Sequence, residues 1–283
     1  MKTKKRIALF IAALALTATV VLSSVAFVGC GAEKITLVGS TSMEELMGVL
    51  ITEYQKTNDV EIEMTCNGSG EGIEAAQDGS CTFGMASRDL KDDETGVKQQ
   101  TIAIDGIAVI TQTTTGANNA TLAQLYDLYA SDVAFADNGV TIDTAVGRET
   151  GSGTRSAFDE LVKKDGAELG EANEGKGYNS AVSLQTSTNN VLNSVKSAKT
   201  PAVGYISLGS VTEDVKALKI EGVEATNENI KADKYALKRN FNLILPEDGV
   251  DALSETAKDF YDFIMGEEGQ KIIADEGYLS VSE

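Results

Sequence analysis

Apolar residues change period repeatedly along the chain, from alternation typical of strands to the three-to-four spacing typical of helices. Val60, Ile62 and Met64 alternate with polar neighbours, whereas residues 101–111 form a nearly continuous apolar run, as expected of a buried central strand. We expect strands at 35–38, 60–64, 81–86, 101–111, 203–207 and 241–245, and helices at 43–54, 72–77, 121–129, 154–163, 190–198, 254–265 and 268–274. The alternation predicts an α/β fold built from βαβ units around a parallel sheet.

The N-terminal segment has the layout of a secretory signal. Four basic residues within the first six precede an apolar run over 7–28, and the run ends at Gly29-Cys30. The small-residue-then-Cys order is similar to a bacterial lipobox, so we expect residues 1–29 to be a signal peptide and Cys30 to be lipidated. The mature protein would then lie outside the cytoplasm, anchored to the cell membrane. A single-pass transmembrane anchor is the alternative.

Charge narrows the choice of partners. The chain of 283 residues carries a formal charge of −19, and removing residues 1–29, which hold four basic residues and no acidic one, lowers it to −23. Such a surface repels nucleic acid and acidic lipid, so we expect no nucleic-acid partner. It does not exclude a small anion, because amide and hydroxyl dipoles act at short range while distant charges are screened beyond about 10 Å.

Histidine and cysteine counts exclude several chemistries. The chain has no His, which removes Ser-His-Asp and Cys-His catalysis and the commonest zinc ligands. Cys66 and Cys81 should lie at opposite edges of a parallel sheet, so we expect two small buried thiols rather than a disulfide. The acidic run 92–94 lacks the alternating spacing of a metal-binding loop. We therefore expect no metal, no cofactor and no enzymatic activity.

Three loops combine glycine with hydroxyl residues just before a helix-like stretch. The most pronounced covers 147–154, in which glycines allow close backbone approach, Ser152 and Thr154 offer hydroxyls, and Arg148 adds a planar fork suited to an oxyanion. The other two cover 39–42 and 67–70. A single such loop is as well explained by ordinary helix capping, but three in one chain favour an anion site.

Together with the Cys30 motif, ordered segments spread over the mature chain carry a resemblance to a known family. They are Gly39–Ser42, Gly68–Ile73, Gly84–Arg88, Asp105–Val109, Gly147–Arg155, Gly204–Ser207 and Glu268–Tyr278. In this combination the chain resembles the phosphate-binding lipoproteins of bacterial phosphate ABC importers. The resemblance implies a monomer with a two-lobed, type II periplasmic-binding-protein fold that holds inorganic phosphate between its lobes and passes it to permease subunits.

The lobe boundaries follow from the strands expected to cross between lobes. The apolar run through 105–111 suits a crossing strand and 241–245 suits its return. We therefore expect lobe I to comprise 30–107 plus 239–283, and lobe II to comprise 108–238.

The resemblance also implies a set of ligand-binding residues. They are Ser40, Thr41, Ser42, Ser69, Ser87, Arg88, Arg148, Ser152, Gly153 and Thr154. Arg88 has two alternative roles, because beside Asp89 it also suits a supporting position behind the ligand contacts or an ion pair between lobes.

One position departs from the family pattern. Ser87 stands where many relatives carry an aspartate that would accept a phosphate proton, and Glu71, Asp105 or Glu149 could supply an acceptor instead. Two alternatives to phosphate capture therefore stay open. One is a carrier of another tetrahedral oxyanion, sulfate or molybdate, and the other is an enzyme acting on phosphate esters, for which no activated nucleophile stands out.

Overall fold

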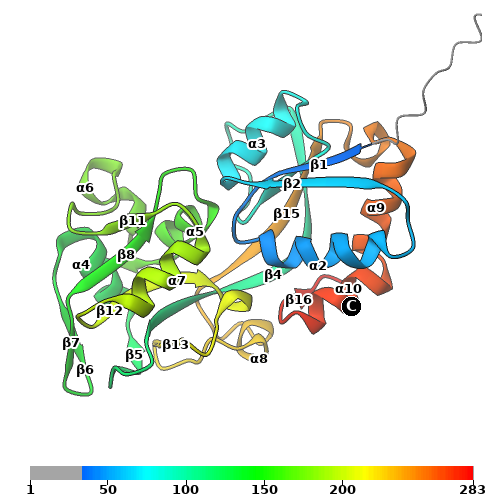
Figure 1. The fold of residues 1–283 in the computed structure, drawn as a ribbon. Coiled ribbons are helices and arrows are strands. Elements are labelled where there is room, and N and C mark those ends of the chain that lie inside the picture. Colours follow the sequence, from blue (N-terminus) through cyan, green and yellow to red (C-terminus); the bar gives the residue numbers. More distant parts are fainter. Residues whose placement is uncertain (1–33, 283) are drawn as a thin grey trace, which may run out of the picture. The chain divides into compact units, whose positions relative to one another are not determined.

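One long strand connects the two halves of the molecule. The computed structural model describes residues 34–282, and within it β4 (Val97–Gln112) pairs antiparallel with β15 (Lys238–Pro246) along its first part and with β12 (Ala202–Ser207) along its second (Figure 1). The ten-stranded sheet runs in the order β11-β8-β12-β4-β15-β3-β1-β2. Short strands β13 (Val215–Ala217) and β16 (Leu279–Ser280) also pair with β4.

The first half of the sheet is formed by β15 and three parallel strands, β3 (Phe83–Ala86), β1 (Lys34–Gly39) and β2 (Glu61–Cys66). One face packs against α2 (Glu44–Gln55), α9 (Glu255–Met265) and α10 (Glu267–Asp275), whose buried Leu46, Phe260 and Ile273 belong to one hydrophobic cluster. The other face receives α3 (Ser69–Gln77), which packs through Ile73 and Ala76.

The second half of the sheet is formed by β12, β8 (Thr144–Arg148) and β11 (Ser183–Gln185), with β8 parallel to both neighbours. Helices α4 (Leu122–Ser131) and α5 (Gly153–Leu161) contribute Tyr129 and Phe158 to the largest cluster, and α7 (Thr188–Ser197) packs in a separate one. Smaller elements are β5 (Asn119–Ala120), β6 (Phe135–Asp137), β7 (Val140–Ile142), β9 (Lys163–Lys164), β10 (Ala167–Glu168), η1 (Leu169–Glu171), α6 (Ala172–Gly175), η2 (Leu208–Ser210), β14 (Lys219–Ile220), α8 (Asn227–Lys231) and η3 (Gly249–Ala252).

The predicted α/β class is confirmed, and every strand and helix expected from the periodicity is present with limits shifted by a few residues. The expectation of a parallel sheet is only partly right, because β4 and its partners β12 and β15 are antiparallel. The strand expected at 101–111 begins four residues earlier, at Val97, where β15 continues to pair with it. The sequence of one strand does not indicate which other strand will pair with it, so this extension could not be predicted.

Cys66 and Cys81 are free thiols, as predicted. Cys66 ends β2 and Cys81 lies just before β3, and β1 lies between these two strands in the sheet. Both are only half-buried, so the expectation of two buried thiols is wrong. The signal peptide 1–29 and Cys30 lie outside the described residues, in which no helix has the length and apolarity needed to span a membrane. The lobe limits stay a prediction.

Candidate functional site

Arg148 ends strand β8, and its peptide groups are held by two side chains. Its N–H donates to the Tyr205 hydroxyl at 3.0 Å, and its carbonyl accepts from Arg155 Nη1 at 3.2 Å. Tyr205 in turn lies 2.5 Å from the Tyr178 hydroxyl and stacks on Phe158 at 4.0 Å between ring centroids. These contacts fix the position at which the loop leaves the sheet.

The Arg148 side chain is only 2% exposed and is oriented by its neighbour Glu149. Nε and Nη2 donate to the two oxygens of Glu149, both at 2.8 Å, in a side-on pair. Nη1 points the other way and donates to the Thr188 hydroxyl at 3.5 Å. Since a guanidinium has five N–H donors, this pairing leaves donors at the end that faces the hydroxyl groups.

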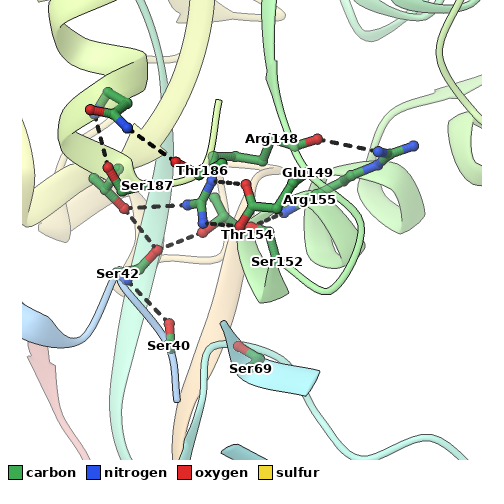
Figure 2. Close-up of polar contacts among 12 residues, drawn as sticks. Ser40, Ser42, Ser69, Arg148, Glu149, Ser152, Thr154, Arg155, Thr186 and Ser187 are labelled. Carbon is green, nitrogen blue, oxygen red and sulfur yellow. Dashed lines mark hydrogen bonds and ion pairs between the residues drawn. The ribbon is translucent and has the colours of Figure 1, made fainter. Parts of the chain in front are cut away.

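Hydroxyls from both halves of the sheet meet in front of Arg148 (Figure 2). From the first half, Ser40 donates to Ser87 at 2.9 Å, and Ser87 lies 3.3 Å from the Ser69 hydroxyl. Ser42 crosses to the second half, with its Oγ 2.5 Å from Thr154 Oγ1 and 3.3 Å from Thr188 Oγ1. All six side chains are buried.

The first turn of α5 packs directly against these hydroxyls. A Cβ on Gly153 would lie 2.1 Å from Ser69 Oγ and 2.6 Å from Ser87 Oγ, so only glycine allows this approach. Beside it, the Gly70 N–H donates to the Gly151 carbonyl at 3.2 Å, a backbone contact between the two halves. The α5 N-terminus therefore faces the residues contributed by the first half of the sheet.

The structure brings together most of the residues that the sequence predicted for the site. Ser40, Ser42, Ser69, Ser87, Arg148 and Thr154 form the contacts above, and Gly153 touches them. Thr41 is buried, and its hydroxyl has no hydrogen-bond partner within residues 34–282. Ser152 caps α5, because its Oγ accepts the Arg155 N–H at 3.3 Å.

Arg88 is the predicted site residue that stands apart. Both ends of its guanidinium donate to Glu94 at 2.6 Å, and Nη1 also donates to the Asp89 carbonyl. The ion pair lies within the segment that follows β3, so it does not join the two halves of the sheet. In the part of the chain that the structure describes, no hydrogen bond joins the Arg88 side chain to the hydroxyl cluster, which is the group of six buried side chains Ser40, Ser42, Ser69, Ser87, Thr154 and Thr188.

Thr188 is a site residue that the sequence reasoning missed. It is the first residue of α7, whose N-cap Ser187 accepts the Asn190 N–H. The hydroxyl run Thr186-Ser187-Thr188 before a helix is the same type of signal that identified the other loops. Glycine is absent from this run, so it lacks the glycine-hydroxyl pattern of the other three loops.

The three candidate proton acceptors, Asp105, Glu71 and Glu149, lie in three different environments. Asp105 is sealed in the sheet, where it accepts Nε and Nη2 of Arg239 at 3.0 and 2.9 Å and the Ser207 hydroxyl at 2.8 Å. Burial raises the pKa of its carboxyl, against the opposing effect of Arg239. Glu71 is exposed on α3, which leaves Glu149 as the candidate carboxylate bonded to Arg148.

Chemically, the arrangement suits reversible binding of a small oxyanion. Hydroxyls, amides at a helix start and one guanidinium are donors that stabilise negative charge in a site shielded from water. Residues 34–282 contain no group of three acidic or cysteine side chains that could hold a metal ion. The serines have no histidine to activate them, since the chain contains none.

Comparisons with known proteins agree with this chemistry. The profile of the PBP superfamily domain matches residues 24–268. The phosphate-binding protein PstS 2 of Streptococcus pneumoniae is 39% identical over 139 residues, 47% of this chain and 44% of that protein, so the chain matches less than half the length of this curated relative. PstS of Borreliella burgdorferi is 24% identical over 88% of this chain and 91% of its own length.

Solved structures extend the likeness over the described fold. A putative phosphate ABC transporter substrate-binding protein from Clostridium perfringens, determined with bound phosphate, is 36% identical, covers 88% of this chain and 100% of its own, and superposes with a TM-score of 0.79. An ABC-type phosphate transport receptor from Vibrio cholerae is 29% identical over 88% of this chain and 100% of its own, with a TM-score of 0.68. The chain thus belongs to the PBP superfamily and, within it, to the phosphate-binding substrate-binding proteins of ABC transporters, the PstS family.

Proposed function

We propose that this chain captures inorganic phosphate at the site around Arg148 and delivers it, outside the cytoplasm, to the permease subunits of an ABC importer. The observation that carries the proposal is the buried guanidinium of Arg148, oriented by Glu149 so that Nη1 faces hydroxyls drawn from both halves of the sheet. A tetrahedral oxyanion offers four oxygens to such a convergent set of donors. The phosphate bound in the Clostridium perfringens relative supports the same ligand class here.

Binding by two halves suits capture and release. We propose that residues 30–107 with 239–283 form lobe I and 108–238 form lobe II, joined by β4 and β15. Ser42 with Thr154, and Gly70 with Gly151, are then contacts between lobes that separate when the ligand leaves. The protein functions as a monomer in this scheme.

Selection of phosphate over sulfate needs an acceptor for the proton that phosphate keeps at neutral pH. Hydroxyls can accept or donate and so discriminate weakly, whereas a carboxylate accepts a hydrogen bond from a protonated phosphate oxygen and repels an unprotonated dianion. Ser87 takes no such role, and Glu149 is the carboxylate at the site. We assign the acceptor role to Glu149, with sulfate or molybdate carriage as the competing outcome.

Titration calorimetry on delipidated protein tests the function directly. We expect one phosphate per chain, much weaker sulfate and molybdate binding, and no hydrolysis of a chromogenic phosphate ester. Sulfate binding as tight as phosphate binding would assign the chain to a general oxyanion carrier. Absence of binding by all three anions would refute the proposal, and ester hydrolysis would favour the enzyme alternative.

We further propose that the mature chain begins at a lipidated Cys30, on the outer face of the cytoplasmic membrane. The basic, apolar, Gly-Cys order of residues 1–30 carries this proposal. Cys30→Ser should move the protein from the membrane fraction to the medium or periplasm. A variant that stays as membrane-bound as the parent would show that lipid on Cys30 is not the anchor.

A further inference from the structure

A short loop separates two groups of donors at the site, the Arg148 side chain at the end of β8 and the amides at the start of α5. The loop covers only 149–152, and Gly151 in it has a φ of +92°, which glycine adopts at little cost. Such a loop does not by itself fix one group of donors relative to the other. Side chains from the second half of the sheet do so instead.

Arg155 connects the start of α5 with the end of β8 (Figure 2). Its Nη1 donates to the Arg148 carbonyl at 3.2 Å, and its Nη2 donates to the Lys176 carbonyl at 2.9 Å. Its Nε donates to Asp159 Oδ2 at 3.3 Å, one turn further along α5. One guanidinium can make these three contacts together because its N–H donors form a rigid planar fork.

Tyr205 holds the other peptide group of the same arginine. Its hydroxyl accepts the Arg148 N–H at 3.0 Å and lies 2.5 Å from the Tyr178 hydroxyl. The Tyr178 ring, in turn, lies beneath the Arg155 guanidinium, whose carbon is 4.3 Å from the ring centroid. The contacts therefore form a closed circuit around the backbone of Arg148. We call Arg155, Tyr178 and Tyr205 the Arg148 clamp.

The Arg148 clamp is packed tightly against β8. Tyr178 and Tyr205 are buried, and a Cβ on Gly147 would lie 2.6 Å from the Tyr178 ring. Within residues 34–282, none of the three clamp side chains forms a hydrogen bond with the hydroxyl cluster in front of Arg148. The clamp side chains thus contact the backbone of the arginine and not the groups that face an anion.

Resting on the proposed function, we propose that Arg155 and Tyr205 are positioning residues for phosphate binding. They hold the Arg148 backbone so that its guanidinium and the start of α5 face one anion in a fixed geometry. Without them, Arg148 would have to be ordered when phosphate binds, and the free energy of that ordering would be lost from the affinity. The clamp therefore raises affinity without touching the ligand.

Two buried tyrosines that bond to the backbone of β8 provide a matched pair of variants. The Tyr205 hydroxyl accepts from Arg148, whereas the Tyr129 hydroxyl donates to the Val146 carbonyl at 2.9 Å, two residues earlier. Both side chains are 0% exposed, and each Tyr→Phe change removes a single oxygen atom. By calorimetry we expect Tyr205→Phe to weaken phosphate binding about tenfold and Tyr129→Phe to stay within about twofold of the parent. Equal affinities for the two variants would overturn the role of Tyr205.

A double-mutant cycle shows whether the effect passes through the Arg148 side chain. Equilibrium dialysis with radiolabelled phosphate extends the measurement to weak binding, so it can include Arg148→Ala and Arg148→Ala/Tyr205→Phe. We expect the tenfold loss caused by Tyr205→Phe in the parent to fall below about twofold in the Arg148→Ala background. A merely structural role would give the same loss in both backgrounds, and that result would overturn the proposal.

Arg155→Lys separates geometry from charge and provides a second route if Tyr205→Phe does not fold. Lysine keeps the positive charge but lacks the planar fork, so we expect phosphate binding to be about tenfold weaker in a variant that urea unfolding shows to be folded. Parent-like affinity would show that the geometry of Arg155 is not needed and would overturn its positioning role. A parent that binds no phosphate would refute the proposed function, whereas a parent that binds phosphate while Tyr205→Phe and Arg155→Lys bind it equally well would refute the clamp alone.

Discussion

The Arg148 guanidinium meets the Glu149 carboxylate side-on, with Nε and Nη2 each 2.8 Å from a carboxylate oxygen. The pair is formally neutral, so a bound dianion is held mainly by directed dipoles rather than by net charge. Because the arginine is already oriented, little side-chain entropy is lost when an anion binds. Mutation can therefore test the two proposed roles separately, Arg148 as donor to the anion and Glu149 as orienting group and acceptor.

Arg148→Ala should weaken phosphate binding at least a hundredfold. Hydrogen bonds to charged groups contribute about 1.5–3 kcal/mol each, and the variant loses at least two possible donors. Arg148→Lys should recover only part of the affinity, because an ammonium has no planar fork. Calorimetry measures both, and a parent-like dissociation constant for Arg148→Ala would remove Arg148 from the site.

Glu149→Gln should reduce the preference for phosphate over sulfate by tenfold or more, about 1.4 kcal/mol. The amide offers one acceptor in place of a carboxylate, and it no longer repels a dianion that carries no proton. Phosphate affinity should therefore fall while sulfate affinity stays or rises. Glu71→Gln, at an exposed glutamate on α3, is the matched control and should leave the ratio unchanged. Equal losses for both anions would assign Glu149 to orienting Arg148 alone.

Gly153→Ala should damage both binding and stability. The added Cβ would lie 2.1 Å from Ser69 Oγ, so α5 and α3 must move apart at a cost of about 1–3 kcal/mol. Gly48→Ala is the control, because a Cβ at Gly48 in α2 meets nothing within 4 Å and alanine favours a helix. Urea unfolding and calorimetry should separate the two, and a Gly153→Ala protein with parent-like values of both would contradict the close approach.

Asp159 should make the protein more stable at acidic than at neutral pH through its own titration. Burial raises the pKa of its carboxyl from 3.8 to about 6, against the opposing effect of Arg155. The folded state thus holds the proton more tightly than the unfolded state, and the free energy of unfolding falls as pH rises from about 4 to 6.

The matched comparison is Asp159→Asn, which removes this titration. By unfolding at pH 4.5 and 7.5, the parent should lose about 2 kcal/mol relative to the variant between the two values, because roughly 1.5 pH units separate 4.5 from the folded-state pKa of about 6, at 1.36 kcal/mol each. Carboxylates common to both proteins cancel in the difference. A pH-independent difference would show that Asp159 has an ordinary pKa.

Much of the fold could be predicted from local patterns. The apolar run within β4 and the amphipathic spacing of α2 and α9 depend on residues close in sequence, so their periods indicate strand and helix without knowledge of partners. The glycine-hydroxyl loops were equally visible, because a loop that precedes a helix has to satisfy the same free amides wherever the helix packs. Arg148 could be singled out because its planar guanidinium adjoins the most pronounced of these loops.

The remaining features of the site depend on contacts between residues far apart in the sequence. Thr188 joins Ser42 across 146 positions of sequence, and Arg88 pairs with Glu94 rather than with the hydroxyl cluster, because packing of the sheet sets which side chains meet. Likewise, Asp105 and Glu149 look equivalent as acceptors in the sequence. In the structure Asp105 pairs with Arg239 of β15, whereas Glu149 pairs with Arg148. Local residue patterns thus indicate the helices, the strands and an anion-binding type of loop. Strand order and register decide which donors and acceptors share one buried site, because both are set by pairing between segments far apart in the chain.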